Sequence, residues 1–164
     1  MEKGHFYFLS QEYFQDFPDK YLMHNKEQIN GELHDRPCFF AFNDIKTPEL
    51  MWLIPFSSKT DKFQRIYDSK MKKNKRCDTI VFGDVLGHRK AFLIQNMCPA
   101  IPKYINSEYI DSKSKSAVRI SGNLEKELIS KAKHVLMLQR QGKKLIFPDV
   151  LSIEATLINK LHPQ

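Results

Sequence analysis

The amino-acid sequence predicts an α+β fold, a compact, curved, antiparallel and barrel-like sheet with C-terminal helices packed on it. Short apolar and aromatic runs separated by turn residues fill the chain up to about residue 120, and helical spacing of apolar residues follows. Strands followed by helices, rather than alternating with them, are typical of this class. At 164 residues the chain fits one hydrophobic core, and no shift in composition marks a boundary, so we expect a single domain over residues 1–164.

The N-terminal region begins with a short apolar run at 6–9, Phe-Tyr-Phe-Leu, which predicts a buried strand. Ser10 is a suitable N-cap for a brief helix that ends before Pro18. Residues 19–36 are polar, and Asn30-Gly31 marks a turn among them. This segment is therefore expected to be a loop.

Two pairs of strands are expected in the middle of the chain. The runs 38–42 and 50–56 are apolar and separated by turn residues, which is the pattern of an antiparallel hairpin. The runs 79–82 and 91–94 are expected to pair across a loop over 83–90. Aromatic residues of the first pair are expected in the core, with stacking on nucleic-acid bases as the alternative; they are Phe39, Phe40, Phe42, Trp52 and Phe56.

Apolar residues recur at helical spacing in the C-terminal part of the chain. The first set predicts a helix capped by Asn123 and followed by Gly142, and the second predicts a helix opened by Pro148-Asp149. Before them, residues 103–110 are expected to include a short extended stretch. The apolar positions are Leu124, Leu128, Ala132, Val135 and Leu136 in the first helix and Val150, Ile153, Leu157, Ile158 and Leu161 in the second.

Composition argues against several classes of protein. No apolar run approaches the roughly 20 residues that cross a bilayer, and the N-terminus lacks the basic and apolar blocks of a secretory signal. Cys38, Cys77 and Cys98 are odd in number and lack Cys-x-x-Cys spacing, so neither a disulfide framework nor a zinc knuckle is expected. These features favour a cytoplasmic protein with no membrane partner.

Positive charge is concentrated in one segment. The chain has 26 Lys and Arg against 19 Asp and Glu, and residues 59–76 hold eight of the basic residues with only Asp61 and Asp68 opposing them. Such a segment attracts nucleic-acid phosphates, and the alternative is a solvated lysine-rich loop. The candidate residues for contacts with RNA phosphates are Lys62, Arg65, Lys70, Lys72, Lys73, Lys75 and Arg76.

Two polar clusters are predicted to meet at one end of the first hairpin. Ser57 and Ser58 follow the strand 50–56 and lead directly into Lys59, while Arg36 precedes the other strand. The start of one antiparallel strand lies beside the end of its partner, so Arg36 is expected to approach both serines. Hydroxyls, a guanidinium and an amine together can bind a phosphate and stabilise charge on its oxygens. The alternatives are a simple turn or helix cap for the serines and a surface contact for Arg36.

Other reactive groups give weaker signals. The histidines form no His-x-x-x-His pair and lack acidic partners at metal-ligand spacing, so no metal or other cofactor is expected. His34 and His88 fall in expected loops, where an acid or base role is an alternative to that of an ordinary surface histidine. Glycine-rich phosphate, dinucleotide and hydrolase motifs are absent.

Three motifs, taken in their order and spacing, carry a resemblance to a known family. They are Arg36-Pro37-Cys38-Phe39-Phe40, Leu53-Ile54-Pro55-Phe56-Ser57-Ser58-Lys59 and Phe92-Leu93-Ile94-Gln95-Asn96-Met97-Cys98-Pro99. The chain resembles the ToxN/AbiQ family of type III toxin–antitoxin endoribonucleases, and within it the CptN-type toxins, from about Phe6 to the last helix.

The resemblance implies a sheet related to that of the MazF/Kid toxins and a metal-independent, sequence-selective endoribonuclease of phage abortive infection. It implies attack by the RNA's own 2′-OH, which leaves 2′,3′-cyclic phosphate and 5′-OH ends. It also implies inhibition by a repetitive, pseudoknotted RNA antitoxin. The toxin is expected to cut the precursor of that RNA, to stay bound to the pieces in a closed protein–RNA hetero-oligomer, and to cut cellular RNAs when free.

Site residues follow from the resemblance by position. Ser57 and Ser58 match the family's active-site hydroxyl pair, and Arg36 matches a basic residue near it. The better-known toxins have a proline before the lysine, whereas Lys59 follows the serines directly here and Lys62 comes three residues later. Which lysine meets the scissile phosphate is therefore left open.

Two other functions fit the same residues. One is a MazF-like mRNA interferase that a protein antitoxin inhibits, which would carry no RNA repeats when purified. The other is a non-catalytic RNA-binding module that uses residues 59–76 as a phosphate track. For such a module, RNA binding should weaken steeply as the salt concentration rises, and no cleaved RNA should form.

Overall fold

The structure, a computed structural model, describes all residues from 1 to 164. Its strands are β1 (Phe6–Leu9), β2 (Lys26–Ile29), β3 (Glu32–Asp35), β4 (Cys38–Asn43), β5 (Met51–Ser57), β6 (Ile80–Val85), β7 (His88–Leu93), β8 (Cys98–Ala100) and β9 (Ile105–Glu108). Its helices are α1 (Gln11–Asp16), α2 (Thr60–Asn74), α3 (Gly122–Arg140) and α4 (Val150–Leu161), with short 3-10 turns η1 (Ile94–Asn96) and η2 (Pro102–Tyr104).

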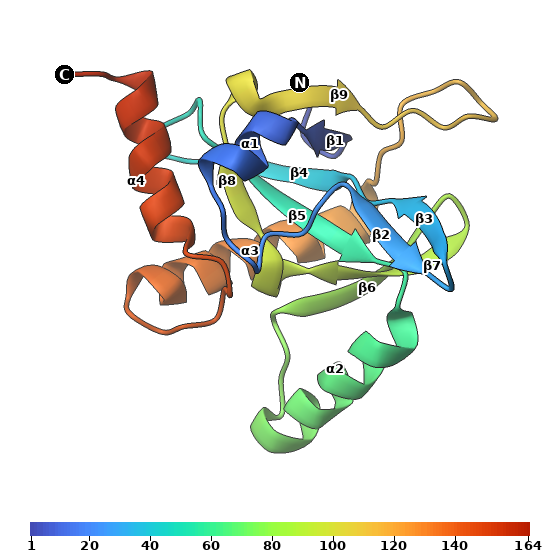
Figure 1. Cartoon of the computed structure of the whole chain (residues 1–164). Coiled ribbons are helices and arrows are strands. Elements are labelled where there is room, and N and C mark those ends of the chain that lie inside the picture. Colours follow the sequence, from blue (N-terminus) through green and yellow to red (C-terminus); the bar gives the residue numbers. More distant parts are fainter.

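Seven strands form one antiparallel sheet in the order β6-β7-β5-β4-β1-β9, with β8 also paired to β5. The hairpin of β2 and β3 stands apart from this sheet (Figure 1). The predicted pairing of β4 with β5 is confirmed, with Cys38 opposite Pro55 and Asn43 opposite Met51. The α+β class is confirmed as well. The sheet is not closed into a barrel, because its end strands β6 and β9 do not pair with each other.

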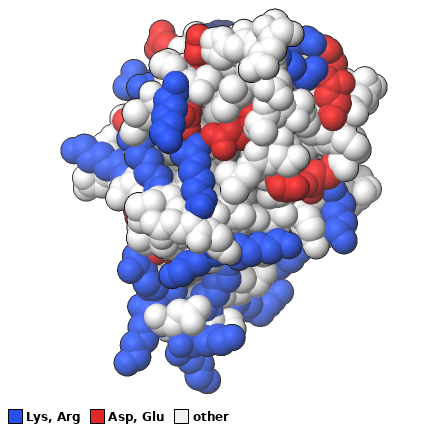
Figure 2. Space-filling model, turned by 90° about the vertical axis from the view of Figure 1, so that its left-hand side faces the viewer, with Lys and Arg blue, Asp and Glu red and all other residues white.

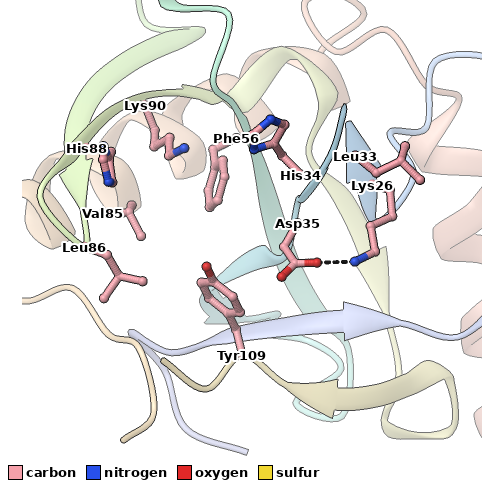
Figure 3. Close-up of a pocket in the computed structure, with 10 residues that line it drawn as sticks. All are labelled: Lys26, Leu33, His34, Asp35, Phe56, Val85, Leu86, His88, Lys90 and Tyr109. Atoms are coloured by element: carbon pink, nitrogen blue, oxygen red, sulfur yellow. Dashed lines mark hydrogen bonds and ion pairs between the residues drawn. The ribbon is translucent and has the colours of Figure 1, made fainter. Parts of the chain in front are cut away.

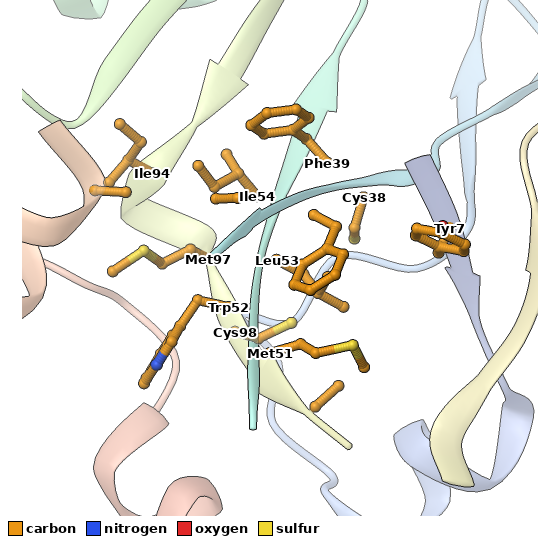
Figure 4. Close-up of a cluster of buried hydrophobic side chains, with 14 of the residues drawn as sticks. Tyr7, Cys38, Phe39, Met51, Trp52, Leu53, Ile54, Ile94, Met97 and Cys98 are labelled. Carbon is orange, nitrogen blue, oxygen red and sulfur yellow. The ribbon is translucent and has the colours of Figure 1, made fainter. Parts of the chain in front are cut away.

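Aromatic and aliphatic side chains of the sheet fill the core (Figure 4). The rings of Phe6 and Phe39 lie 5.6 Å apart, and those of Phe6 and Phe56 lie 5.9 Å apart. All five aromatic residues expected in the core are at most 7% exposed, which confirms the core interpretation. The three cysteines are buried and form no disulfide.

Caps and apolar faces place the helices. Ser10 Oγ accepts a hydrogen bond from the Tyr13 N–H at the start of α1, and Asp149 accepts one from the Ser152 N–H at the start of α4, as the sequence predicts. The helix α3 begins one residue before the predicted cap and packs against β4 through Leu128 and its helical neighbours. None of the helices is long and apolar enough to cross a membrane.

Two segments expected to be loops contain strands. Within residues 19–36, β2 and β3 pair across the turn at Asn30-Gly31, although β3 is fully exposed and carries no apolar alternation. Within 83–90, β6 and β7 continue to a two-residue turn at Leu86-Gly87, where both residues have positive φ. This geometry matches a tight hairpin turn, which glycine favours at its second position. The pairing of β6 with β7 places Lys90 on a strand, opposite Gly83.

The cationic segment is a helix rather than a solvated loop. In α2, Phe63, Ile66 and Tyr67 lie on one side and pack on Ile80 and its neighbours, while most of the basic side chains are exposed. The helix projects away from the sheet, directly after β5 (Figure 1).

Candidate active site

Arg36 and the two serines meet at a single buried carboxylate, Glu27 of β2. Arg36 Nη2 lies 2.9 Å from Glu27 Oε2, and the Ser57 hydroxyl donates to the same oxygen. The Ser58 N–H donates to Glu27 Oε1 over 2.8 Å. The structure therefore brings Arg36, Ser57 and Ser58 together at the end of the β4–β5 hairpin.

The two serine hydroxyls have different surroundings. Ser57 is 0% exposed; its hydroxyl donates to Glu27 and accepts from the Lys59 N–H at 3.1 Å. Ser58 is half-buried, and its Oγ accepts a hydrogen bond from Lys90 Nζ at 2.6 Å. Because Lys90 occupies an acceptor position of this oxygen, the Ser58 proton remains available to a ligand. The Ser57 hydroxyl is fully used within the turn, whereas the Ser58 hydroxyl retains a proton that it can donate to a ligand.

Lys90 has an unusual environment for a lysine. It lies on β7 opposite Gly83, and its Nζ is 5.4 Å from the centre of the Phe56 ring. Burial lowers the pKa of the Lys90 ammonium below its usual range, and the charge of Glu27 opposes this shift in part. An amine in such a setting releases its proton more readily than an exposed lysine does.

Arg36 retains a free donor. Its Nε atom is buried and has no hydrogen-bond partner, while one terminal nitrogen pairs with Glu27. Buried donors are nearly always satisfied in folded proteins, so an unpaired one at a polar cluster calls for an explanation. A bound anion is one group that would accept from a guanidinium.

A pocket of about 350 Å³ opens beside the Ser58–Lys90 pair. Figure 3 shows Phe56 and Tyr109 facing its interior, with His34 on one side and His88 near Lys90 on the other. The two histidines that the sequence offered as acid or base therefore share one pocket. The complete lining is Lys26, Leu33, His34, Asp35, Phe56, Val85, Leu86, His88, Lys90 and Tyr109.

The predicted phosphate-binding residues extend along and beyond α2. Lys59 precedes its first residue with an exposed side chain, and Lys75 ends it in a left-handed conformation. Two of the seven predicted residues are engaged elsewhere: Lys70 donates to Thr79 and Gln95, and Arg76 pairs with Asp78. The remaining five are exposed and form no ion pair, and Figure 2 shows basic side chains crowded over the lower end of the molecule, where α2 lies.

Sequence reasoning missed Glu27 and Lys90. Glu27 lies within residues 19–36, which were expected to be a loop. The only signal in the sequence is its place in the short run Lys-Glu-Gln-Ile, which directly precedes the turn residues Asn30-Gly31. Lys90 lies within residues 83–90, the other segment that was expected to be a loop. An interpretation of this segment as part of a hairpin would have placed Lys90 on a strand beside β5. The structure contains no group of three or more His, Cys, Asp or Glu side chains placed to hold a metal ion.

Comparison with known proteins identifies a solved structure with a similar fold. No family model matches the sequence, and no curated protein matches it. Among solved structures, the chain is similar to AbiQ, a lactococcal anti-phage endoribonuclease of the type III toxin–antitoxin system. The TM-score is 0.63 and the sequence identity 16%, and the match covers 97% of this chain and 99% of AbiQ. The chain therefore has the AbiQ fold over nearly its whole length.

Proposed function

We propose that residues 1–164 act as one endoribonuclease domain and that the protein is the toxin of a type III toxin–antitoxin system. The observation that carries the proposal is the convergence of Arg36, Glu27, Ser58 and Lys90 beside an open pocket that Lys90 lines. The AbiQ fold and the basic helix α2 beside the same turn support it. Together they supply a phosphate-binding centre, a proton-transfer pair and a surface for a polyanion.

The proposed reaction uses the RNA's own nucleophile and no metal. The ribose 2′-oxygen attacks phosphorus, the bond from phosphorus to the 5′-oxygen breaks, and the products are a 2′,3′-cyclic phosphate and a 5′-OH end. The site has to align these atoms and stabilise negative charge on the phosphoryl oxygens. Arg36 and Lys59 are proposed to stabilise that charge. Glu27 and Ser57 are proposed to position Arg36 and Ser58.

Ser58 and Lys90 are proposed to protonate the leaving group. Ser58 would give its proton to the departing 5′-oxygen and take one from the Lys90 ammonium over their 2.6 Å hydrogen bond. The lowered pKa of Lys90 favours this transfer. His34 and His88 line the adjoining pocket and are the candidate groups to accept the 2′-OH proton.

The proposed partners are an RNA antitoxin and cellular RNAs. The exposed basic residues on and next to α2 that form no ion pair would contact RNA phosphates, and Arg76, exposed but paired with Asp78, lies beside them; the unpaired ones are Lys59, Lys62, Arg65, Lys72, Lys73 and Lys75. The antitoxin is proposed to be a repetitive, pseudoknotted RNA that the toxin processes and holds in a closed hetero-oligomer. Its inhibition would be relieved during phage infection.

One experiment tests this function against its rivals. The protein is purified from cells that carry its gene with the DNA upstream, and bound nucleic acid is sequenced. We expect short, uniform RNA repeats with 5′-OH and cyclic-phosphate ends, and cleavage of added RNA in EDTA once the repeats are removed. A protein partner without RNA would indicate a protein-inhibited interferase. RNA that is bound but never cut would contradict the enzymatic proposal.

A further inference from the structure

The pocket beside Ser58 and Lys90 is lined by apolar and aromatic side chains together with charged and polar ones. Phe56 lies at its inner end and the Tyr109 ring forms one side (Figure 3). Leu33 and Leu86 line it from the β2–β3 and β6–β7 hairpins, and they are 69% and 47% exposed. Two exposed leucines on separate hairpins that line one pocket are not explained by packing of the protein itself.

The polar edge is formed by Asp35 and its neighbours. Lys26 donates to Asp35 Oδ1, and the second carboxylate oxygen points toward the interior in Figure 3. Burial and the nearby charge of Asp35 raise the pKa of Tyr109, so its hydroxyl stays protonated near neutral pH. The pocket therefore offers a hydrogen-bond acceptor and a hydroxyl donor close to aromatic and apolar side chains.

A nucleobase matches this combination. Unpaired bases are recognised by stacking on aromatic side chains and by hydrogen bonds to their polar edges. A volume of about 350 Å³ suits one nucleoside-sized group, since small-molecule pockets start at about 300 Å³. Lys90 lines the pocket and also contacts Ser58, so a base held there lies next to the proposed phosphate site.

We propose that this pocket holds the unpaired base of the nucleotide adjoining the scissile phosphate, with the Tyr109 ring against one of its faces, Asp35 on its edge and Leu33 contacting it from the pocket wall. The proposal rests on the proposed function and adds that the RNA must be single-stranded at the cut. Asp35 accepts hydrogen bonds, so a base whose exocyclic amine places two N–H donors on its edge is favoured over uracil, whose single N3–H lies between two carbonyl oxygens that a carboxylate repels. Tyr109, Leu33 and Asp35 are specificity residues and take no part in proton transfer.

The test is a set of short single-stranded RNAs in which one nucleotide at a time around the cut is made abasic. With the wild-type protein, an abasic nucleotide at one position adjoining the cut is expected to lower kcat/KM by about 5- to 150-fold, the range of base–aromatic stacking. Leu33→Ala and Tyr109→Ala are expected to lower kcat/KM for intact RNA and to abolish most of that penalty. Leu33→Ala makes the test robust, because its side chain is exposed and its loss leaves the core intact.

Ile45→Ala is the matched control, since Ile45 is 89% exposed and lies outside the pocket. It should retain the full abasic penalty, whereas Asp35→Asn should lose the preference against uracil. Equal penalties at every position, or equal behaviour of Leu33→Ala and Ile45→Ala, would overturn the proposal. If the wild type cuts no RNA, the proposed function fails separately. The dissociation constants of the same abasic series then decide whether the pocket holds a base.

Discussion

Removal of the Glu27 side chain should destabilise the protein far more than removal of an exposed glutamate. Glu27 is buried and pairs with Arg36 at 2.9 Å, with the Ser58 N–H at 2.8 Å and with the Ser57 hydroxyl. Glu27→Ala leaves a largely buried guanidinium and two further donors without their acceptor. Loss of one partner of a buried ion pair costs about 3–5 kcal/mol, so we expect the free energy of unfolding to fall by that amount.

The assay is urea denaturation followed by circular dichroism, with Glu127→Ala as the matched control. Glu127 pairs with Lys131 at 2.9 Å on the exposed side of α3, and loss of such a pair costs about 0.2–1 kcal/mol. Glu27→Gln retains an acceptor for the Ser58 N–H and should fall between the two. Equal losses for Glu27→Ala and Glu127→Ala would show that the carboxylate does not organise the site.

Three further results are expected. Cleavage by the wild type should decline as pH rises through the pKa of Lys90, which is lowered from 10.5, because proton transfer from Lys90 through Ser58 to the leaving group needs the protonated amine. Lys90→Arg should move this decline to higher pH, and Lys90→Met should remove the decline along with most of the activity. Burial raises the pKa of Asp44, but hydrogen bonds from Arg140, the Lys46 N–H and Trp52 outweigh it and lower the pKa below 3.8. The stability that Asp44 contributes is therefore present above pH 3.8 and lost below it, so urea unfolding of wild type and Asp44→Asn should converge as pH falls. Lys62→Ala and Lys72→Ala should each weaken RNA binding and reduce the slope of log K against log salt by about 1, whereas Lys160→Ala on α4 should leave it unchanged.

The parts of the fold with strong apolar patterns were predictable from the sequence. The β4–β5 hairpin, the caps of α1 and α4 and the buried aromatic residues follow from local patterns that agree with their tertiary surroundings. Antiparallel pairing then sufficed to place Arg36 near Ser57 and Ser58. The likeness to the AbiQ fold agrees with the resemblance drawn from short motifs.

The missed residues lie where local patterns carry no such information. The strand β3 is exposed along its whole length, so hydrophobic alternation is absent from it. The strands β6 and β7 are joined by a turn at Leu86-Gly87, in which Leu86 has a positive φ. Leucine rarely adopts this conformation, so the sequence Leu-Gly does not indicate a turn of this kind. Glu27 and Lys90, which lie on these hairpins, reach the site only through long-range contacts: Glu27 is 30 residues from Ser57, and Lys90 is 32 residues from Ser58.

The most direct test of the proposed active site is the single-turnover cleavage rate of Ser58→Ala on a defined RNA. Ser130→Ala, on the exposed side of α3, is the control for the loss of a serine hydroxyl. We expect Ser58→Ala to retain its stability and cleave about 10²–10³-fold more slowly, as on removal of one transition-state donor, while Ser130→Ala cleaves at the wild-type rate. A Ser58→Ala variant that cleaves RNA as fast as the wild type would contradict the proposed centre.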